Sequence, residues 1–476
     1  MSVADLPPEQ PLPVPEPLSP PPAPPGRFVT GSILRHILVM TGTGAVGLMA
    51  IFFGDFANIL FLGLLGDIEV LAAVGYASSI LFFTVSACIG LAIATTSLVA
   101  PAIGRGDMAR ARELSTHLHI ASVVVAIVVV VAMWPWLRSA LAWLGATGRT
   151  LDLAHGYVRL VVPSLPLLAL GMCSSAVLRS VGDARRAMYI TLSGAVVTMV
   201  LDPIFILWLG LGIEGAAISS LVSRLCVAIV GVSAVIRVHG LMARPRWRVL
   251  QHGDAALIAR FAIPAVLANV ATPVSNAFVT MTIARFSDSA VAGWAVVGRV
   301  TPVAFGAIFA LSGAIGPIIG QNLGARAFGR VRLSLTEALR AAVIFTGVAW
   351  VVLFLSVPAL VSLFGLTGEA ADLFAFYCRW LSPLFVFFGT LFVSNAACNT
   401  LGRPHFATAL NWTRATLGTL PFVTLGAQWG GAKGVLIGNM AGGVVFGLIA
   451  VWVVFRLIAT LEKDLGSGKN SARPPE

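Results

Sequence analysis

Long apolar stretches alternate along the chain with short polar segments that contain charged residues, glycine or proline. A helix needs about 20 consecutive, mostly apolar residues to cross the hydrocarbon core of a bilayer. Twelve stretches meet this requirement, so we predict an all-α membrane protein with twelve transmembrane helices. The predicted spans are residues 33–62, 70–103, 117–143, 156–180, 187–210, 214–238, 257–285, 290–322, 337–363, 373–400, 406–428 and 432–459.

The composition favours the same class. Of the 476 residues, 58% are hydrophobic and 11% are charged, whereas a soluble domain carries about 25% charged residues. The net charge of +11 does not indicate binding to nucleic acid, because the basic residues lie between hydrophobic segments. Arginine and lysine concentrate at the termini and in the loops after even-numbered spans. The positive-inside rule therefore predicts a multi-pass protein of the plasma membrane, in bacteria the inner membrane, with both termini in the cytoplasm.

The two halves of the chain resemble each other at an offset of 220 residues. The segment "LGATGRTLDLAHGYVRLVVP" (144–163) aligns without a gap with "FGLTGEAADLFAFYCRWLSP" (364–383), and residues 103–112 align with 323–332. Two homologous halves of six spans enter the membrane in the same direction and form parallel repeats, with a cavity between them near the midplane. This organisation indicates transport, so we do not expect an enzyme.

The polar segments divide the chain into five predicted parts. These are a disordered proline-rich cytoplasmic tail (1–27), an N-terminal six-helix lobe (28–238), a basic cytoplasmic linker (239–256), a C-terminal six-helix lobe (257–460) and a disordered cytoplasmic tail (461–476). The first 25 residues contain eleven prolines and no apolar run, unlike a signal peptide. The five cysteines lie in apolar segments and the histidines do not cluster, so we expect no disulfide, no metal site and no cofactor.

Several segments, taken in order, resemble the multidrug and toxic compound extrusion (MATE) transporters, especially the prokaryotic branch of DNA-damage-inducible exporters. They are "LRSVGDARRAMYITLSGAVVTMVLDPIF" (178–205), "LGLGIEGAAISSLVSR" (209–224), "IGPIIGQNLGARAFGRVR" (315–332) and "NTLGRPHFATALNWTRATLGTLPF" (399–422). The resemblance implies a V-shaped bundle of two lobes. It also implies a secondary active antiporter that exports amphipathic organic cations and drugs in exchange for protons or sodium ions.

The resemblance further implies an ion-coupling site in the N-terminal lobe. In the family this site has an acid on the first helix, an Asn-x-x-x-Asp pair on the fifth and a threonine on the sixth. The matching residues here are Asp55, Thr198, Asp202 and Ser220. Thr198 stands where the family has asparagine, and Ser220 where it has threonine, so proton and sodium coupling both stay open.

The residues themselves point to the same site. Asp55 and Asp202 are the only acids well inside an apolar span, where a charge costs roughly 2.5–3.5 kcal/mol. At about 1.5 Å per residue, both acids and Ser220 lie roughly 11–12 Å below the outer surface. Burial and a neighbouring acid favour the protonated form of a carboxyl, and a cationic substrate would compete with that proton. Pro203 removes a backbone donor and disturbs the carbonyl of Met199, so we expect a hinge there.

Other polar residues have two open interpretations. Arg224 lies deeper than Ser220 on the same span, and it is either a counter-ion of Asp202 or independent of it. The second half has Ser275 and Phe422 at the positions of the two acids. Its first span carries a neutral stripe that either bonds to neighbouring helices or lines the substrate pathway. The stripe consists of Asn269, Thr272, Asn276 and Thr280.

Rival functions fit less well. A flippase of lipid-linked precursors, from the same superfamily, is the alternative, but it would favour two extra spans and a cationic cavity. A membrane enzyme would show clustered His, Asp or Glu at one interface. We therefore expect small organic cations and membrane lipid as partners, no nucleic acid, and a monomer.

Overall fold

The computed structural model describes residues 26–242 and 253–466. The predictions for the two tails and the basic linker lie largely outside these residues. The described part is built of helices joined by short turns and contains no strand.

Helices of the first half occupy residues 33–238. They are α1 (Ile33–Gly63), α2 (Ile68–Gly104), α3 (Met108–Met133), α4 (Leu137–Trp143), α5 (Gly148–Val161), α6 (Leu165–Val181), α7 (Ala184–Asp202) and α8 (Gly212–Ser233). A π-helix, Pro203–Trp208, continues α7, and a second, Ala234–Val238, continues α8.

Helices of the second half begin at Asp254. They are α10 (Asp254–Ile283), α11 (Asp288–Ala304), α12 (Gly306–Gly324), α13 (Phe328–Leu363), α14 (Gly368–Phe376), α15 (Phe385–Thr400), α16 (Pro404–Thr416) and α17 (Leu420–Gly466). A π-helix (Tyr377–Leu381) and a short 3-10 turn connect α14 to α15.

The prediction of twelve spans is confirmed, although the described residues contain eleven continuous segments that are long and apolar enough to cross a membrane. The last of these, Pro404–Asp464, contains two spans because the backbone leaves helical geometry at Gly430 and Gly431. Around this reversal the two arms of α17 pack with backbones in contact, since a Cβ on Gly434 would overlap the carbonyl of Gly426. Only glycine allows so close an approach.

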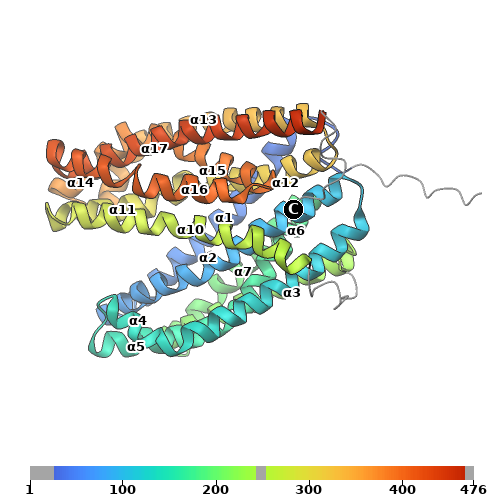
Figure 1. The fold of residues 1–476 in the computed structure, drawn as a ribbon. Coiled ribbons are helices and arrows are strands. Elements are labelled where there is room, and N and C mark those ends of the chain that lie inside the picture. The colour runs from blue at the N-terminus through green and yellow to red at the C-terminus, as the bar shows by residue number, and fades with distance from the viewer. Residues whose placement is uncertain (1–25, 243–252, 467–476) are drawn as a thin grey trace, which may run out of the picture.

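The helices form two lobes that meet at one end, where the described part of the chain begins, and diverge toward the other (Figure 1). We call these the joined end and the open end. Helix α1 packs on α7 of the first lobe and on α12 and α13 of the second, while α10 packs on α2 and on α16 and α17. Each lobe thus sends its first helix across to the other, as Figure 1 shows for α10.

Tertiary hydrogen bonds confirm the repeat. Asn58 on α1 bonds to Asp202 on α7 across 144 residues of sequence. In the second lobe Ser275 on α10 bonds to Thr419 across the same 144 residues. The first and fifth spans of each half therefore pack in the same register.

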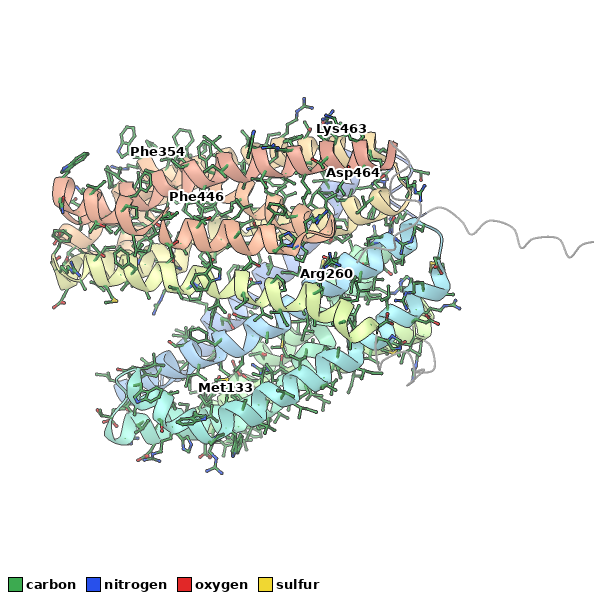
Figure 2. The ribbon with its side chains drawn as sticks, viewed as in Figure 1. Met133, Arg260, Phe354, Phe446, Lys463 and Asp464 are labelled. Atoms are coloured by element: carbon green, nitrogen blue, oxygen red, sulfur yellow. The ribbon has the colours of Figure 1, made fainter. Side chains whose placement is uncertain are left out.

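Large apolar side chains cover the outside of the lobes, as Figure 2 shows around Phe354. Leu355 is 73% exposed and Val352 57% exposed on the same helix, α13. A continuous apolar surface of this kind is rare on a soluble protein. It is the surface expected of helices that face lipid.

Candidate ion-coupling site

Glycines bring α1 unusually close to α7. A Cβ on Gly47 would overlap the hydroxyl of Thr191, and one on Gly54 would lie 4.0 Å from the Cα of Ala195. Gly47 and Gly54 are seven residues apart and therefore share one face of α1. This close packing brings the next residues of α1 within reach of the end of α7.

Asp202 is the last residue of α7, and its side chain is fully buried. Its Oδ2 accepts a hydrogen bond of 2.8 Å from Nδ2 of Asn58. Its Oδ1 is also buried but has no hydrogen-bond partner among the described residues. A buried carboxylate oxygen without a donor is costly, so Oδ1 is where a proton or a cation would gain most by binding.

The hydroxyl of Ser219 on α8 lies beside this carboxylate. It is buried too, and it has no hydrogen-bond partner within the described residues. The two groups interact electrostatically without meeting the geometry of a hydrogen bond. The Ser219 oxygen is therefore a second candidate ligand for an ion held at Oδ1.

Asp55 lies on α1 one turn before Asn58, so the two side chains share a face. Unlike Asp202, Asp55 is exposed. The two carboxylates are close enough to repel each other electrostatically. The structure thus brings the two predicted acids together, one buried and one accessible.

Ser220 and Thr198, the other two predicted ligands, do not bind the carboxylate in this structure. Ser220 lies beside the hydroxyl of Tyr157 on α5. Thr198 donates to the carbonyl of Gly194 in its own helix, at 3.1 Å. Asn58 and Ser219 occupy the positions next to Asp202 instead.

Arg224 lies near the site but does not pair with Asp202. Its Nη1 donates to Oγ of Ser164 at 2.9 Å and to the carbonyl of Val161 at 3.2 Å. Both acceptors lie at the junction of α5 and α6. In this conformation, then, the guanidinium holds the α5–α6 junction and leaves the carboxylate unpaired.

The backbone changes to a π-helix at Pro203, the predicted hinge. Within this wider turn the carbonyl of Phe205 approaches α8 so closely that a Cβ on Gly215 would lie 2.6 Å from its oxygen. The π-helix therefore follows Asp202 directly and packs on α8 through glycine. Irregular backbone inside a membrane protein is tolerated where protein or a cavity satisfies it.

The neutral stripe on α10 divides into two groups. Thr280 accepts a bond of 3.0 Å from Nε1 of Trp294 on α11, so it joins two helices. Asn269 donates to the carbonyl of Ala265 in its own helix. Asn276 is exposed and Thr272 half-buried, which leaves these two accessible to a substrate.

Polar contacts close the joined end. Gln321 on α12 donates to the carbonyl of Ser180 on α6 at 2.6 Å and accepts from the backbone N–H of Phe28 at 2.7 Å. Arg330 on α13 donates to the carbonyl of Phe28 at 2.9 Å. The segment before α1 and one buried glutamine therefore link the two lobes.

An ion cluster links the lobes at a second point of the joined end. Arg110 on α3 pairs with Asp254, the first residue of α10. Nδ1 of His117, also on α3, lies 2.6 Å from the same carboxylate. Asp254 and His117 are both buried, so this contact belongs to the closed interface.

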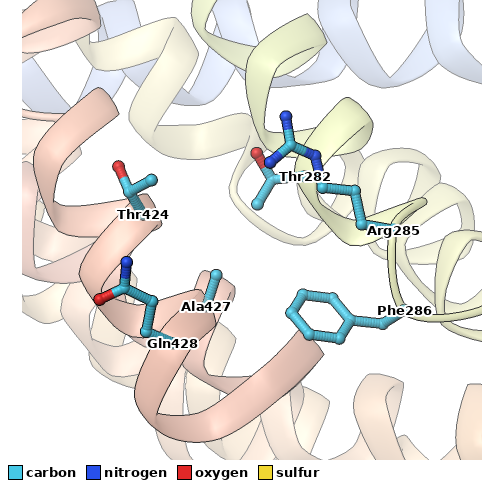
Figure 3. Close-up of a pocket in the computed structure, with 6 residues that line it drawn as sticks. All are labelled: Thr282, Arg285, Phe286, Thr424, Ala427 and Gln428. Carbon is cyan, nitrogen blue, oxygen red and sulfur yellow. The ribbon is translucent and has the colours of Figure 1, made fainter.

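Two pockets lie near the open end, one in each lobe. The pocket of the second lobe has a volume of about 300 Å³, and Figure 3 shows Arg285 and Gln428 on its opposite walls. The pocket of the first lobe, of about 350 Å³, contains Asp67 and Arg149. The hydrogen bond from Arg149 holds the pKa of Asp67 below its ordinary value. Neither pocket includes Asp55 or Asp202, and in the described residues no three His, Cys, Asp or Glu gather as a metal site.

Asn58, Ser219 and Tyr157 are site residues that the sequence reasoning missed. Asn58 follows Asp55 by three residues, a spacing that places it on the same helical face. The Tyr157 hydroxyl interacts electrostatically with Asp55, Asp202 and Arg224. The spacing from Asp55 could have identified Asn58 in the sequence. No such pattern identified Ser219 or Tyr157.

Two solved structures of membrane transporters have a similar fold. The structure resembles an outward-facing multidrug resistance MATE family transporter of the MOP superfamily with a TM-score of 0.87, at 22% identity over 93% of this chain and 99% of that one. It resembles a mutant of the Vibrio cholerae MATE transporter VcmN with a TM-score of 0.83, at 24% identity over 89% of this chain and 96% of that one. The chain therefore shares the two-lobed fold of these solved structures.

Sequence comparison identifies the family. The MatE family model matches residues 45–204 and 264–424, one segment in each half. A FAD transporter of Shewanella oneidensis is 28% identical over 86% of this chain and 92% of that protein. A probable multidrug resistance protein of Bacillus subtilis, YpnP, is 24% identical over the same shares, 86% and 92%. The chain belongs to the MATE family of multidrug and toxic compound efflux transporters, whose members are not enzymes.

Proposed function

We propose that this transporter exports small amphipathic organic cations across the plasma membrane in exchange for protons or sodium ions, by alternating access. The observation that carries the proposal is the fully buried carboxylate of Asp202, which has one oxygen bonded to Asn58 and the other without a partner. An unpartnered anionic oxygen inside a membrane marks an ion site by default.

Coupling follows from the different exposure of the two acids. A proton or sodium ion that enters from the open end meets Asp55 first, because Asp55 is exposed. It then reaches Oδ1 of Asp202. Neutralising the two carboxylates removes the negative charge that holds a cationic substrate, so the substrate leaves as the ion binds. Competition for one negative site is the basis of exchange.

We propose that the joined end faces the cytoplasm. Arginines gather at the helix ends there: Arg105, Arg110, Arg112, Arg185, Arg186, Arg326, Arg330 and Arg332. The positive-inside rule places such loops in the cytoplasm. The V then opens to the outside, and the contacts of Gln321 and Asp254 form the closed inner gate.

The relatives widen the range of substrates to test. One of them is named as a probable multidrug resistance protein and the other as a FAD transporter. Organic cations follow from the two carboxylates of the first lobe, and we propose them as the first substrates. Flavin nucleotides are the second candidate, supported by the similarity to the FAD transporter.

The test is efflux in proteoliposomes under an imposed pH or sodium gradient, with ethidium as the cation. We expect gradient-driven efflux by the wild type and its loss in Asp55→Asn and Asp202→Asn. Asp152→Asn is the matched control, because that carboxylate is exposed and pairs with Arg138 on the surface. Gradient-driven efflux that survives unchanged in both site variants would rule out the carboxylate mechanism.

A further inference from the structure

A pocket at the open end of the second lobe combines a positive charge with free hydrogen-bond donors. It lies between the end of α10 and the first arm of α17, and its volume is about 300 Å³. Its lining residues are Thr282, Arg285, Phe286, Thr424, Ala427 and Gln428 (Figure 3). None of these residues is acidic and Arg285 is cationic, so the lining carries a net positive charge.

Arg285 and Gln428 have donors that are free to bind a ligand. Neither side chain forms a hydrogen bond or ion pair with any described residue. The hydroxyls of Thr282 and Thr424, by contrast, donate to carbonyls one turn back in their own helices. Because Arg285 and Gln428 lie on opposite walls (Figure 3), one anion between them can accept hydrogen bonds from a guanidinium and an amide.

Apolar side chains are exposed on both sides of this pocket. Met281 lies one turn before Arg285 on α10 and is 65% exposed. On α17, Leu425 and Trp429 directly follow residues that line the pocket, and they are 48% and 86% exposed. Exposed apolar side chains that gather in this way mark a contact with the membrane. The pocket therefore borders a surface that lipid covers.

The pocket lies at the level of the lipid headgroups. Helix α10 has 30 residues and ends at Ile283, two residues before Arg285. A helix of this length spans about 45 Å, more than the hydrocarbon core of about 30 Å, so its ends reach the polar interface. Trp429 directly precedes the reversal at Gly430 and Gly431, and tryptophan is enriched at this interface. A phosphate group at this level is within reach of Arg285.

We propose that this pocket binds the phosphate group of a phospholipid at the open end. Arg285 and Gln428 donate to the phosphate, and an acyl chain lies along Met281 and Leu425. Arginine suits this role because its planar fork matches the geometry of phosphate oxygens. All the lining residues belong to the second lobe, and none belongs to the candidate ion site. A bound lipid would therefore fasten the end of α10 to α17 without changing the separation of the two lobes or the coupling mechanism.

Native mass spectrometry of the purified full-length protein in detergent tests this site, because it counts bound lipid molecules. The protein is titrated separately with dioleoylphosphatidylglycerol, with dioleoylglycerol, which has the same acyl chains but no phosphate, and with inorganic phosphate. We expect the wild type to bind the phospholipid more tightly than either of the other two. Arg285→Gln should weaken binding of the first phospholipid molecule by roughly 10- to 100-fold, the range for loss of a charged hydrogen bond, and leave binding of dioleoylglycerol unchanged.

Two further variants show whether the effect belongs to this pocket. Arg285→Lys keeps the charge and should retain part of the affinity for the phospholipid. Arg138→Gln removes an exposed arginine near the open end of the first lobe, where it pairs with Asp152, and should retain the wild-type affinity. Each protein is first checked for a single peak in gel filtration.

Three results would overturn the proposal. The first is equal affinity of the wild type for the phospholipid and for dioleoylglycerol. The second is binding of the phospholipid by Arg285→Gln that is unchanged, or that is weakened no more than in Arg138→Gln. The third is binding of inorganic phosphate as tight as that of the phospholipid, because the pocket would then be a site for a free anion.

Discussion

Asn58 of α1 donates a 2.8 Å hydrogen bond to the buried carboxylate of Asp202 at the end of α7. This bond joins the helix that crosses between the lobes to the helix that carries the candidate ion site. A change of charge on Asp202 therefore acts directly on the contact between α1 and α7.

Asn58→Ala removes the donor and leaves Oδ2 of Asp202 buried without a partner. We expect a loss of about 1–3 kcal/mol in stability, measured by thermal unfolding in detergent. The pH of half-maximal proton-driven efflux should rise, because a hydrogen bond to a carboxylate favours its ionised form. Asn269→Ala is the control, since among the described residues the Asn269 side chain donates to a carbonyl of its own helix. An unchanged pH profile would show that the bond does not tune coupling.

Gly47→Ala places a Cβ on the hydroxyl of Thr191, which bonds to the carbonyl of Met188. We expect α1 and α7 to separate slightly, with reduced efflux and a loss of stability of about 1–3 kcal/mol, typical of overpacking. The double variant Gly47→Ala with Thr191→Ala should recover most of the efflux and most of the stability. Gly42→Ala, where a Cβ meets nothing within 4 Å, is the control. Equal effects of Gly47→Ala and Gly42→Ala on efflux and stability would contradict the proposed role of close packing.

Gln321→Ala leaves the carbonyl of Ser180 and the N–H of Phe28 without partners at the joined end. Each unsatisfied group costs about 1–3 kcal/mol, which is enough to shift a two-state equilibrium toward opening at this end. Distances between spin-label pairs across the open end should shorten. Gln428→Ala, at the pocket near the open end, should leave the distribution as in the wild type. If Gln321→Ala shows the same spin-label distances as the wild type, this glutamine is not a gate contact.

Asp183 is the N-cap of α7 and lies outside the spans. Its contacts lead us to expect that the stability of the protein depends on pH. Desolvation acts to raise its pKa, but bonds from Arg186 and His239 outweigh it, so the pKa of Asp183 lies below its ordinary value. A carboxylate with a depressed pKa stabilises the fold above its unfolded pKa, and the gain is lost as pH falls through the folded pKa.

Asp183→Asn should therefore unfold at a lower temperature than the wild type at pH 7. Asparagine retains the helix cap, so the expected loss is that of the charge interactions with Arg186 and His239, about 0.2–1 kcal/mol at a partly exposed site. The difference should vanish under acidic conditions, where wild-type Asp183 is protonated. A difference that persists at low pH would mean that the charge is not responsible.

The number of spans, the repeat and the level of the two acids could all be predicted from the sequence, because they depend only on helix length and spacing. A span near 20 residues and a rise of about 1.5 Å per residue suffice to place Asp55 and Asp202 at one depth. The two spans within Pro404–Asp464 were also predictable, since glycines and a charged residue, Lys433, mark the turn between them.

The partners of Asp202 were decided only by the tertiary structure. Ser219 and Ser220 are adjacent, yet they point about 100° apart around the helix, and only packing determines which one faces α7. The close approach of Gly47 and Gly54 to α7 sets the rotation of α1 that delivers Asn58. Arg224 bonds to acceptors at the α5–α6 junction that lie 60 and 63 residues away in sequence. The depth of a residue in the membrane depends on its own helix alone. The direction in which its side chain points depends on the neighbours against which that helix packs.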